Sequence, residues 1–302
     1  MKQTPYIPLS LSIQDAGGAV LAHAETKAFP LPHAAADEGS ASAAPAHGAA
    51  EAAEATGAPV WLNLVYAAEY AEGDTITLTA RAHSHLVLQL DDALEPAVVY
   101  LSGERFTYPI PFAEKKLSYN PKTFSGSTHL LRARVATSAE IAQYRNLALN
   151  SHDCATNSTC FPHASANIET RGESVFAARN AINGNTVNTS HGAWPYESWG
   201  INRDPNAALY LDFGRAVTID RLVLVTRADF PHDSWWKEAT VTFSDGSSLV
   251  LPMQKSYAPH VFTFAPKTVT ALTLQKLIKS EEDDSPFPAL TQLEVYGHEA
   301  NA

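Results

Sequence analysis

The sequence lacks the features that mark a membrane protein or a nucleic-acid-binding protein. Its 302 residues contain no apolar run of about 18 residues, the length that a helix needs to cross a bilayer, so we expect no membrane span. Lys and Arg number 21 against 32 Asp and Glu, which gives a formal net charge of −11. Because phosphate binding requires clustered basic residues, this balance argues against nucleic acid or anionic membrane as a partner.

Cysteine is also scarce, and the motifs of common enzyme classes are missing. Cys154 and Cys160 are the only two cysteines. Two free thiols are the first interpretation of this pair, a disulfide closing the short loop is the second, and a metal site is the third. The chain has no G-x-S-x-G turn, no H-E-x-x-H motif and no glycine-rich phosphate loop. We therefore expect a protein that is not an enzyme.

The N-terminus does not resemble a signal peptide. Met1 is followed by one Lys and then by Pro and polar residues, where a signal peptide would carry its apolar core. We expect a cytoplasmic protein if Met1 is the native start, and a secreted or surface protein if the chain has been trimmed.

Short runs rich in β-branched and aromatic residues dominate the rest of the chain. The run TITLTA at 75–80 alternates apolar and polar residues, as in a strand that is buried on one face. Asp245 and Gly246 separate two such runs and are a strong hairpin signal. Helical patterns are almost absent, which leaves no room for β-α-β units. The sequence predicts an all-β protein with two tandem antiparallel β-sandwich domains of jelly-roll type, joined by a short helix.

Composition places the boundaries of these two domains. Residues 1–136 are expected to form the first sandwich, interrupted at 33–58 by a low-complexity insertion in which half of the 26 residues are Ala. The sequence TSAE at 137–140 is a capping box that opens a short helix, and 137–149 is the expected linker. Residues 150–298 are expected to form the second sandwich. We recognise no family for the first.

Two weaker patterns have mainly structural interpretations. His83 and His85 have a spacing that metal sites use, but a solvent-facing pair is the favoured interpretation. The carboxylates at 281–284 are expected to lie on a solvated loop between the last two strands.

Aromatic residues concentrate in two irregular segments of the second half. The segments 191–214 and 226–246 hold four of the five Trp, interleaved with His, Asp and Arg. A site that stacks an apolar face and hydrogen-bonds polar rims needs this combination, and a sugar presents both surfaces. The pattern favours carbohydrate recognition.

The order of motifs in this half resembles the coagulation-factor 5/8 type C (discoidin) domain. The motifs are the NAINGN turn at 180–185, a Trp-bearing loop, ALYLDFGRAVTIDRLVLVTR at 208–227 and LTQLEVYG at 290–297. This galactose-binding-like jelly roll also serves as a family 32 carbohydrate-binding module. The resemblance covers roughly residues 150–298, about half of the chain. It implies a sandwich that binds its ligand with loops at one end.

The resemblance also implies which residues bind the ligand. Arg227 suits a bidentate contact with adjacent hydroxyls, and a Trp suits stacking on the sugar ring. One or two of the tryptophans are expected to pack in the core instead, Trp199 first among them. The expected ligand-binding residues are His191, Trp194, Arg227, Asp229, His232, Trp235 and Trp236.

A structural Ca²⁺ near the NAINGN turn is a further implication of the resemblance. The matching positions are Asn183, Asn185, Thr186 and Glu294, with Asn183 where the family usually has Asp. The loss of a carboxylate weakens a Ca²⁺ site, so an Asn–Gly turn without an ion is the alternative.

We therefore expect a non-catalytic carbohydrate-binding protein. The first alternative is a structural or assembly protein that uses the same loops to contact a homo-oligomer copy or another protein partner. The second is a glycoside-active enzyme that uses Asp229, Asp233 and the carboxylates at 281–284.

Overall fold

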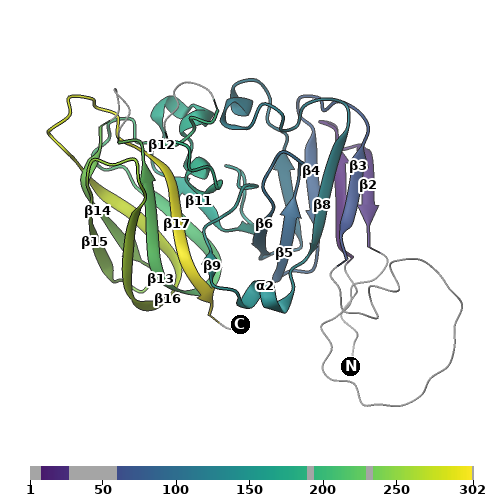
Figure 1. Ribbon diagram of the computed structural model, residues 1–302. Helices are drawn as coiled ribbons and strands as arrows, with labels where there is room; N and C mark the ends of the chain where they lie inside the picture. The colour runs from purple at the N-terminus through teal and green to yellow at the C-terminus, as the bar shows by residue number, and fades with distance from the viewer. Residues whose placement is uncertain (1–7, 27–59, 189–193, 229–233, 301–302) are drawn as a thin grey trace, which may run out of the picture.

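Antiparallel sheets and two hydrophobic cores make up the computed structural model, which describes residues 8–26, 60–188, 194–228 and 234–300 (Figure 1). The prediction of an all-β protein is confirmed. The Ala-rich insertion predicted at 33–58 lies outside the described residues. No helix in the described part of the chain has the length and apolar character that a membrane crossing requires.

Two sheets enclose the first core. One has the order β2-β1-β4-β7 and the other the order β10-β6-β5-β8-β3, and all neighbouring strands are antiparallel. Alternate side chains of these strands, such as Leu11, Ile76 and Leu86, are buried between the sheets. The strands are β1 (Ser10–Gln14), β2 (Val20–Glu25), β3 (Leu62–Tyr66), β4 (Thr75–Thr79), β5 (Ser84–Gln89), β6 (Ala97–Leu101), β7 (Arg105–Pro109), β8 (His129–Val135) and β10 (Cys160–Phe161).

Long, bent strands enclose the second core. They follow the order β12-β17-β13-β16-β14-β15, with β11 added beside β13 and β9 beside β17. The register between β13 and β16 shifts twice, and such irregularities let a long strand bend around a core. The predicted Asp245–Gly246 hairpin joins β14 to β15. The strands are β9 (Arg145–Asn146), β11 (His163–Ala166), β12 (Trp199–Gly200), β13 (Leu209–Thr226), β14 (Trp236–Phe243), β15 (Ser248–Pro252), β16 (His260–Lys279) and β17 (Ala289–Glu299).

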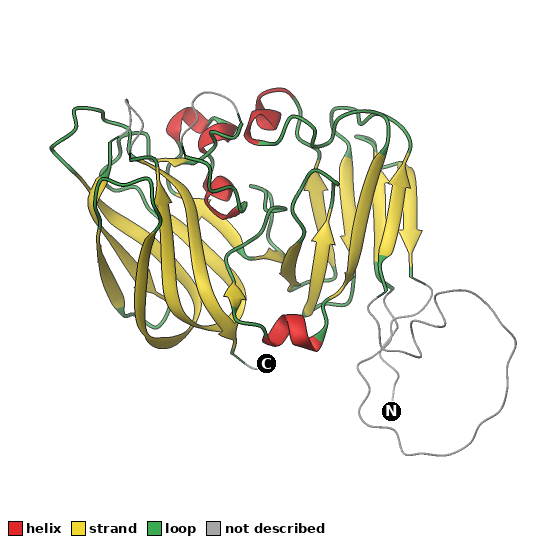
Figure 2. Cartoon of the chain, in the orientation of Figure 1, coloured by secondary structure: helices red, strands yellow, loops and turns green. Residues whose placement is uncertain are grey.

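Short helices lie at the two ends of the molecule. The 3-10 helices are η1 (Ala113–Ser118), η2 (Thr170–Gly172), η3 (Ser174–Phe176) and η4 (Ala178–Ile182), and they lie toward the end opposite α2 (Ser138–Ala142) (Figure 2). The predicted capping box of α2 is confirmed, because the Thr137 hydroxyl accepts from the backbone of Glu140 and the Glu140 carboxylate accepts from the backbone of Thr137. The helix ends at Ala142, and the chain continues into β9.

The chain crosses between the two cores more than once after α2. Strand β9 pairs with β17, and Leu147 belongs to the second core. Cys154 and Cys160 then pack in the first core, where β10 pairs with β6, before β11 returns to the sheet of the second core. Strand pairing and packing thus place residues from both sides of the boundary predicted at 150 in each of the two units.

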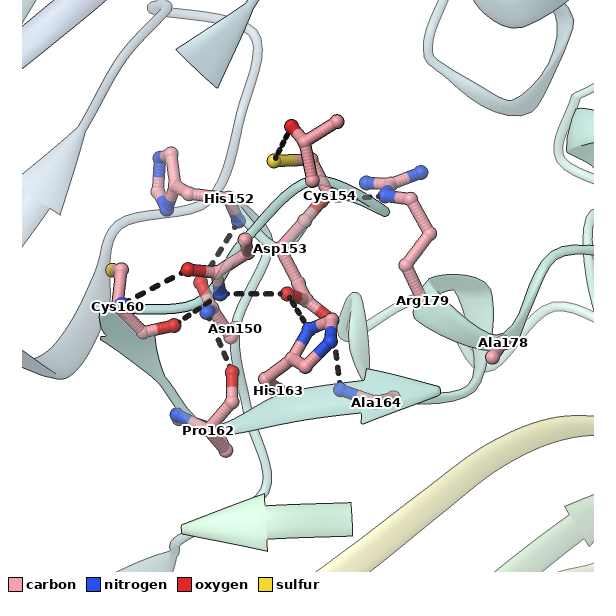
Figure 3. A network of polar contacts seen from close by, with 12 residues as sticks. Asn150, His152, Asp153, Cys154, Cys160, Pro162, His163, Ala164, Ala178 and Arg179 are labelled. Carbon is pink, nitrogen blue, oxygen red and sulfur yellow. Dashed lines mark hydrogen bonds and ion pairs between the residues drawn. The ribbon is translucent and has the colours of Figure 1, made fainter. Parts of the chain in front are cut away.

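A buried polar network around Asp153, with Arg179 at one side of it, joins the cores (Figure 3). The Arg179 guanidinium donates to the Asp153 carbonyl over 2.8 Å and lies 4.3 Å from the centre of the Tyr119 ring. Nearby, the backbone N–H of Leu90 donates to Nε2 of His152. Burial, followed by the charge of Arg179, lowers the pKa of His152 to about 3, so this imidazole is neutral at physiological pH. The network links η4 to the loops of the first core.

A second contact between the cores explains why the prediction for His85 was wrong. His85 is not solvent-facing, because its Nε2 lies 3.3 Å from the carboxylate of Glu299 and its side chain is only 17% exposed. Arg145 and Arg215 also contact Glu299, each at 2.6 Å. Burial alone would raise the pKa of Glu299, but the hydrogen bonds from His85 and Arg215 outweigh it and lower that pKa.

The two cysteines are free thiols in the structure, which was the first of the three interpretations of this pair. Cys154 and Cys160 are both buried free thiols. Burial raises the pKa of each thiol, which keeps both in the protonated, unreactive form.

Candidate functional site

A cavity of 380 Å³ lies at the end of the second core where η2, η3 and β12 meet the start of β17. Its buried lining combines apolar residues with Thr170 and Arg227, and its exposed lining includes Arg171, Asn202 and Arg203. The lining residues are Thr170, Arg171, Glu173, Val175, Phe176, Tyr196, Gly200, Ile201, Asn202, Arg203, Arg227, Phe287, Pro288 and Ala289.

Three arginine–aromatic pairs line this cavity. The guanidinium carbon of Arg227 lies 3.6 Å from the centre of the Tyr196 ring. The corresponding distances are 4.3 Å for Arg203 over Phe287 and 5.5 Å for Arg171 over Phe176. A guanidinium over an aromatic face is held by the ring quadrupole and keeps N–H groups available at its edges. The cavity thus combines flat apolar faces with fixed hydrogen-bond donors.

Backbone strain concentrates at the same place. Arg171, Asn202 and Arg203 have φ values of 53°, 49° and 62°, the left-handed region that side chains other than Gly rarely adopt. Strained residues cluster at binding sites because the surrounding structure holds them in a required position. Three of the seven such non-glycine residues in the described chain line this one cavity.

Gly200 is required by a close approach beneath the cavity. A Cβ atom at this position would lie 2.6 Å from the hydroxyl oxygen of Thr170 and 3.2 Å from Phe176. The same hydroxyl accepts a hydrogen bond from the backbone N–H of Asn202 at 2.9 Å. Gly200 therefore allows η2 to reach the strained turn at 202–203 and to hold it in place.

Arg227 is the predicted ligand-binding residue that lines the cavity. Its side chain is only 1% exposed, and its Nη1 donates to the Tyr196 carbonyl over 2.9 Å. Trp194 is partly buried two residues before Tyr196. Three of the predicted residues, His191, Asp229 and His232, lie outside the described residues.

Trp199, Trp235 and Trp236 pack inside the protein. Trp236, on β14, is fully buried in the second core, so the interpretation of this residue as a ligand contact is corrected to a packing role. Trp235 is 9% exposed. Trp199 is fully buried, and its indole N–H donates to the Ile168 carbonyl, as expected for the tryptophan assigned first to the core. Large indole rings fill the space between bent strands that smaller side chains would leave open.

Sequence reasoning missed five of the six residues in the arginine–aromatic pairs: Arg171, Phe176, Tyr196, Arg203 and Phe287. Phe287 carried a usable signal, since Pro286 and Pro288 flank it in a loop and leave its ring 38% exposed. Arg171 and Arg203 carried no such signal in the sequence. They are about 30 positions apart, and only the fold brings them to the same cavity.

The described side chains do not assemble the predicted Ca²⁺ site. The Gly184 N–H donates to Oε1 of Gln292, which turns the Gln292 amide nitrogen toward Asn183 Oδ1 at 2.8 Å. A hydrogen-bond donor thus takes up the Asn183 oxygen that a cation would need. The other predicted ligands do not converge on that oxygen: Asn185 donates to Glu197, Thr186 is exposed, and Glu294 accepts from Tyr296. The residues present do not fit the ion in this arrangement.

Glu197 is a buried carboxyl beside this turn. It accepts from the amide nitrogens of Asn183 and Asn185 at 3.2 and 2.7 Å, and it is 2% exposed. Burial raises its pKa. Among the described residues, no cluster of three or more His, Cys, Asp or Glu could hold a metal.

The carboxylates of the enzyme alternative do not form a catalytic pair in the described chain. Asp283 forms an ion pair with Lys255 at 2.9 Å, and Glu281, Glu282 and Asp284 are exposed. The acidic segment is therefore a solvated loop between β16 and β17, as predicted. Asp229 and Asp233 lie outside the described residues.

Comparisons with known proteins find similarity in solved structures alone. No protein-family model and no curated protein matches the chain. A chitosan-binding module of a chitosanase/glucanase from Paenibacillus sp. IK-5 is 18% identical over 51% of this chain and 100% of the module, with a TM-score of 0.37. The family 32 module of NanJ from C. perfringens, solved with galactose, is 17% identical over 44% and 91%, with a TM-score of 0.34. A fucose-binding module from Streptococcus pneumoniae is 13% identical over 51% and 98%, with a TM-score of 0.38.

These solved structures are carbohydrate-binding modules, and each match covers about half of this chain. Identities and TM-scores of this size do not indicate which ligand this chain binds.

Proposed function

We propose that the protein binds carbohydrate, without transforming it, in the cavity between η2, η3, β12 and the start of β17. The observation that carries the proposal is the set of three arginine–aromatic pairs around one cavity. Its volume of 380 Å³ lies within the roughly 300–1,000 Å³ that is typical of small-molecule sites. Aromatic rings suit the C–H faces of a sugar, and guanidinium N–H groups suit its hydroxyls.

Phe287 is the stacking surface that the proposal assigns. It is the most exposed of the three aromatic rings at the cavity, and Arg203 covers one of its faces. Tyr196 lies deeper and is covered by Arg227. The predicted role of Arg227 as a donor to hydroxyls is retained in this proposal.

The chemistry of the cavity supports binding without turnover. Glycoside hydrolysis uses two carboxyl groups on opposite sides of the scissile bond. Glu173 is the one carboxylate among the described lining residues, and Arg171 holds both of its oxygens at 2.6 and 2.7 Å. The hydrogen bond from Arg171 lowers the pKa of Glu173, which opposes a role as general acid.

A glycan array tests this proposal with three proteins: the wild type, Phe287→Ala and Tyr210→Ala. Tyr210 is a matched control because its ring is 42% exposed on β13, and it does not line the cavity. We expect the wild type and Tyr210→Ala to bind the same glycans and Phe287→Ala to lose them. Circular dichroism confirms that each protein is folded.

Two outcomes would contradict the proposal. If the folded wild type binds no glycan, the result would favour the assembly alternative, in which the cavity contacts another protein chain. Glycan binding that survives Phe287→Ala would place the binding site away from the cavity.

A further inference from the structure

The charged residues of the cavity indicate the chemical class of its ligand, an inference that rests on the proposed carbohydrate site. Arg171 and Glu173 neutralise one another through two hydrogen bonds. Arg203 is different, because it is exposed and no described carboxylate lies within ion-pair distance of it. Among the described residues, Arg203 is thus an uncompensated cation at the cavity of a protein whose formal net charge is −11.

The position of Arg203 is set by its backbone rather than by an ion pair. Asn202 and Arg203 both adopt left-handed φ values, and the Asn202 N–H is held by Thr170 at 2.9 Å. This turn places the guanidinium 4.3 Å from the centre of the Phe287 ring. A side chain that is already fixed loses less conformational freedom when it binds a ligand.

We infer that the cavity selects sugars that carry an anionic group, a carboxylate or a sulfate, with Arg203 as the specificity-determining residue. The planar guanidinium presents paired N–H donors that match the two oxygens of such a group, and its positive charge attracts them. A neutral sugar would leave this charge unmatched, and an amino sugar would be repelled by it. Phe287 stacks on the ring of the same sugar.

Isothermal titration calorimetry with galactose and galacturonic acid tests this inference, because the two sugars differ only at C6. We expect galacturonic acid to bind about tenfold more tightly, the effect of one partly exposed charge-assisted contact. The preference should fall when NaCl is raised from about 20 mM to about 500 mM, because salt screens exposed charges. If the array identifies another sugar ring, its uronic-acid and 6-sulfo forms replace galacturonic acid, and these two forms separate carboxylate from sulfate recognition.

The variant Arg203→Gln should lower the affinity for the anionic sugar about tenfold more than it lowers the affinity for the neutral sugar, so that the preference is lost. The control variant is Arg81→Gln, because Arg81 is exposed and lies between β4 and β5, and it should leave both affinities unchanged. A neutral or amino sugar that binds as tightly as the anionic one would overturn the inference while the proposed carbohydrate site stands. A preference that persists in Arg203→Gln would also overturn it. The proposed function is contradicted by a different result, namely that the folded wild type binds no glycan on the array.

Discussion

Replacement of Arg179 by Met is expected to destabilise the protein by about 3 kcal/mol. Arg179 extends from η4 into the junction between the two cores, where it is 9% exposed and stacks on Tyr119. Its Nε donates to the Asp153 carbonyl over 2.8 Å, and a weaker contact of 3.5 Å reaches the Ser151 carbonyl. Met keeps most of the volume of the side chain but offers no donor.

The magnitude follows from the contacts that are lost. A buried carbonyl left without its donor costs about 1–3 kcal/mol. A desolvated cation–π contact contributes about 2 kcal/mol. Removing a buried charge also relieves its desolvation penalty, which offsets part of the sum and leaves about 3 kcal/mol. That is a large share of the roughly 5–15 kcal/mol that stabilises a typical domain.

Urea denaturation followed by circular dichroism and by tryptophan fluorescence measures this change. Four of the five tryptophans lie in the second half of the chain, so fluorescence reports mainly on the second core. We expect Arg179→Met to lower the free energy of unfolding, and we expect the two probes to separate if the cores unfold in sequence. Arg81→Met is the exposed control.

A free energy of unfolding for Arg179→Met within about 0.5 kcal/mol of the wild type and of Arg81→Met would refute the reasoning. It would mean that the contacts of Arg179 are replaced by water in solution or that relief of desolvation cancels their loss. The description of Arg179 as the link between the cores would then be incorrect.

Three other predictions follow from the same contacts. Burial and Arg179 lower the pKa of His152 to about 3, so as pH falls below about 6.5 the unfolded chain takes up a proton before the folded chain does. Between these two pH values the free energy of unfolding of the wild type should fall by about 1.4 kcal/mol per pH unit relative to His152→Gln, as measured by urea titration. Parallel pH profiles of the two proteins would contradict this. Gly200→Ala should abolish glycan binding in the array while the circular dichroism spectrum is retained, since its Cβ would displace Thr170 and the turn at 202–203; unchanged binding would contradict the role of Gly200. Ca²⁺ and EDTA should leave the melting temperature unchanged, because Gln292 donates to Asn183, and a rise of several degrees with Ca²⁺ would contradict this.

The longer strands could be predicted from the sequence because they are marked locally. The strand at TITLTA, the Asp245–Gly246 turn and the capping box at 137–140 depend on neighbouring residues alone, and the structure contains all three. The strand is not buried on one face only, because Thr77 is buried together with Ile76 and Leu78. The crossing of the chain between the cores at Cys154 and Cys160 was not predictable in the same way. The two-residue strand β10 is too short to give a periodic pattern, and its position depends on its partner β6.

The candidate site was predicted only in part for a similar reason. Arg227 follows a recognisable strand, and its position at the end of β13 could be inferred. Tryptophan is as useful in a core as in a binding site, so the sequence could not separate the buried Trp236 from a ligand contact. Arg203 and Phe287 are 84 positions apart in the chain, and only the fold brings them together.

The most direct test of the central claim is a two-dimensional ¹⁵N NMR titration of the protein with its tightest glycan from the array. If the glycan binds in the cavity, the amide signals that shift most should come from 170–176, 196–203 and 287–289. Shifts confined to amides outside these segments, with the cavity signals unchanged, would contradict the account.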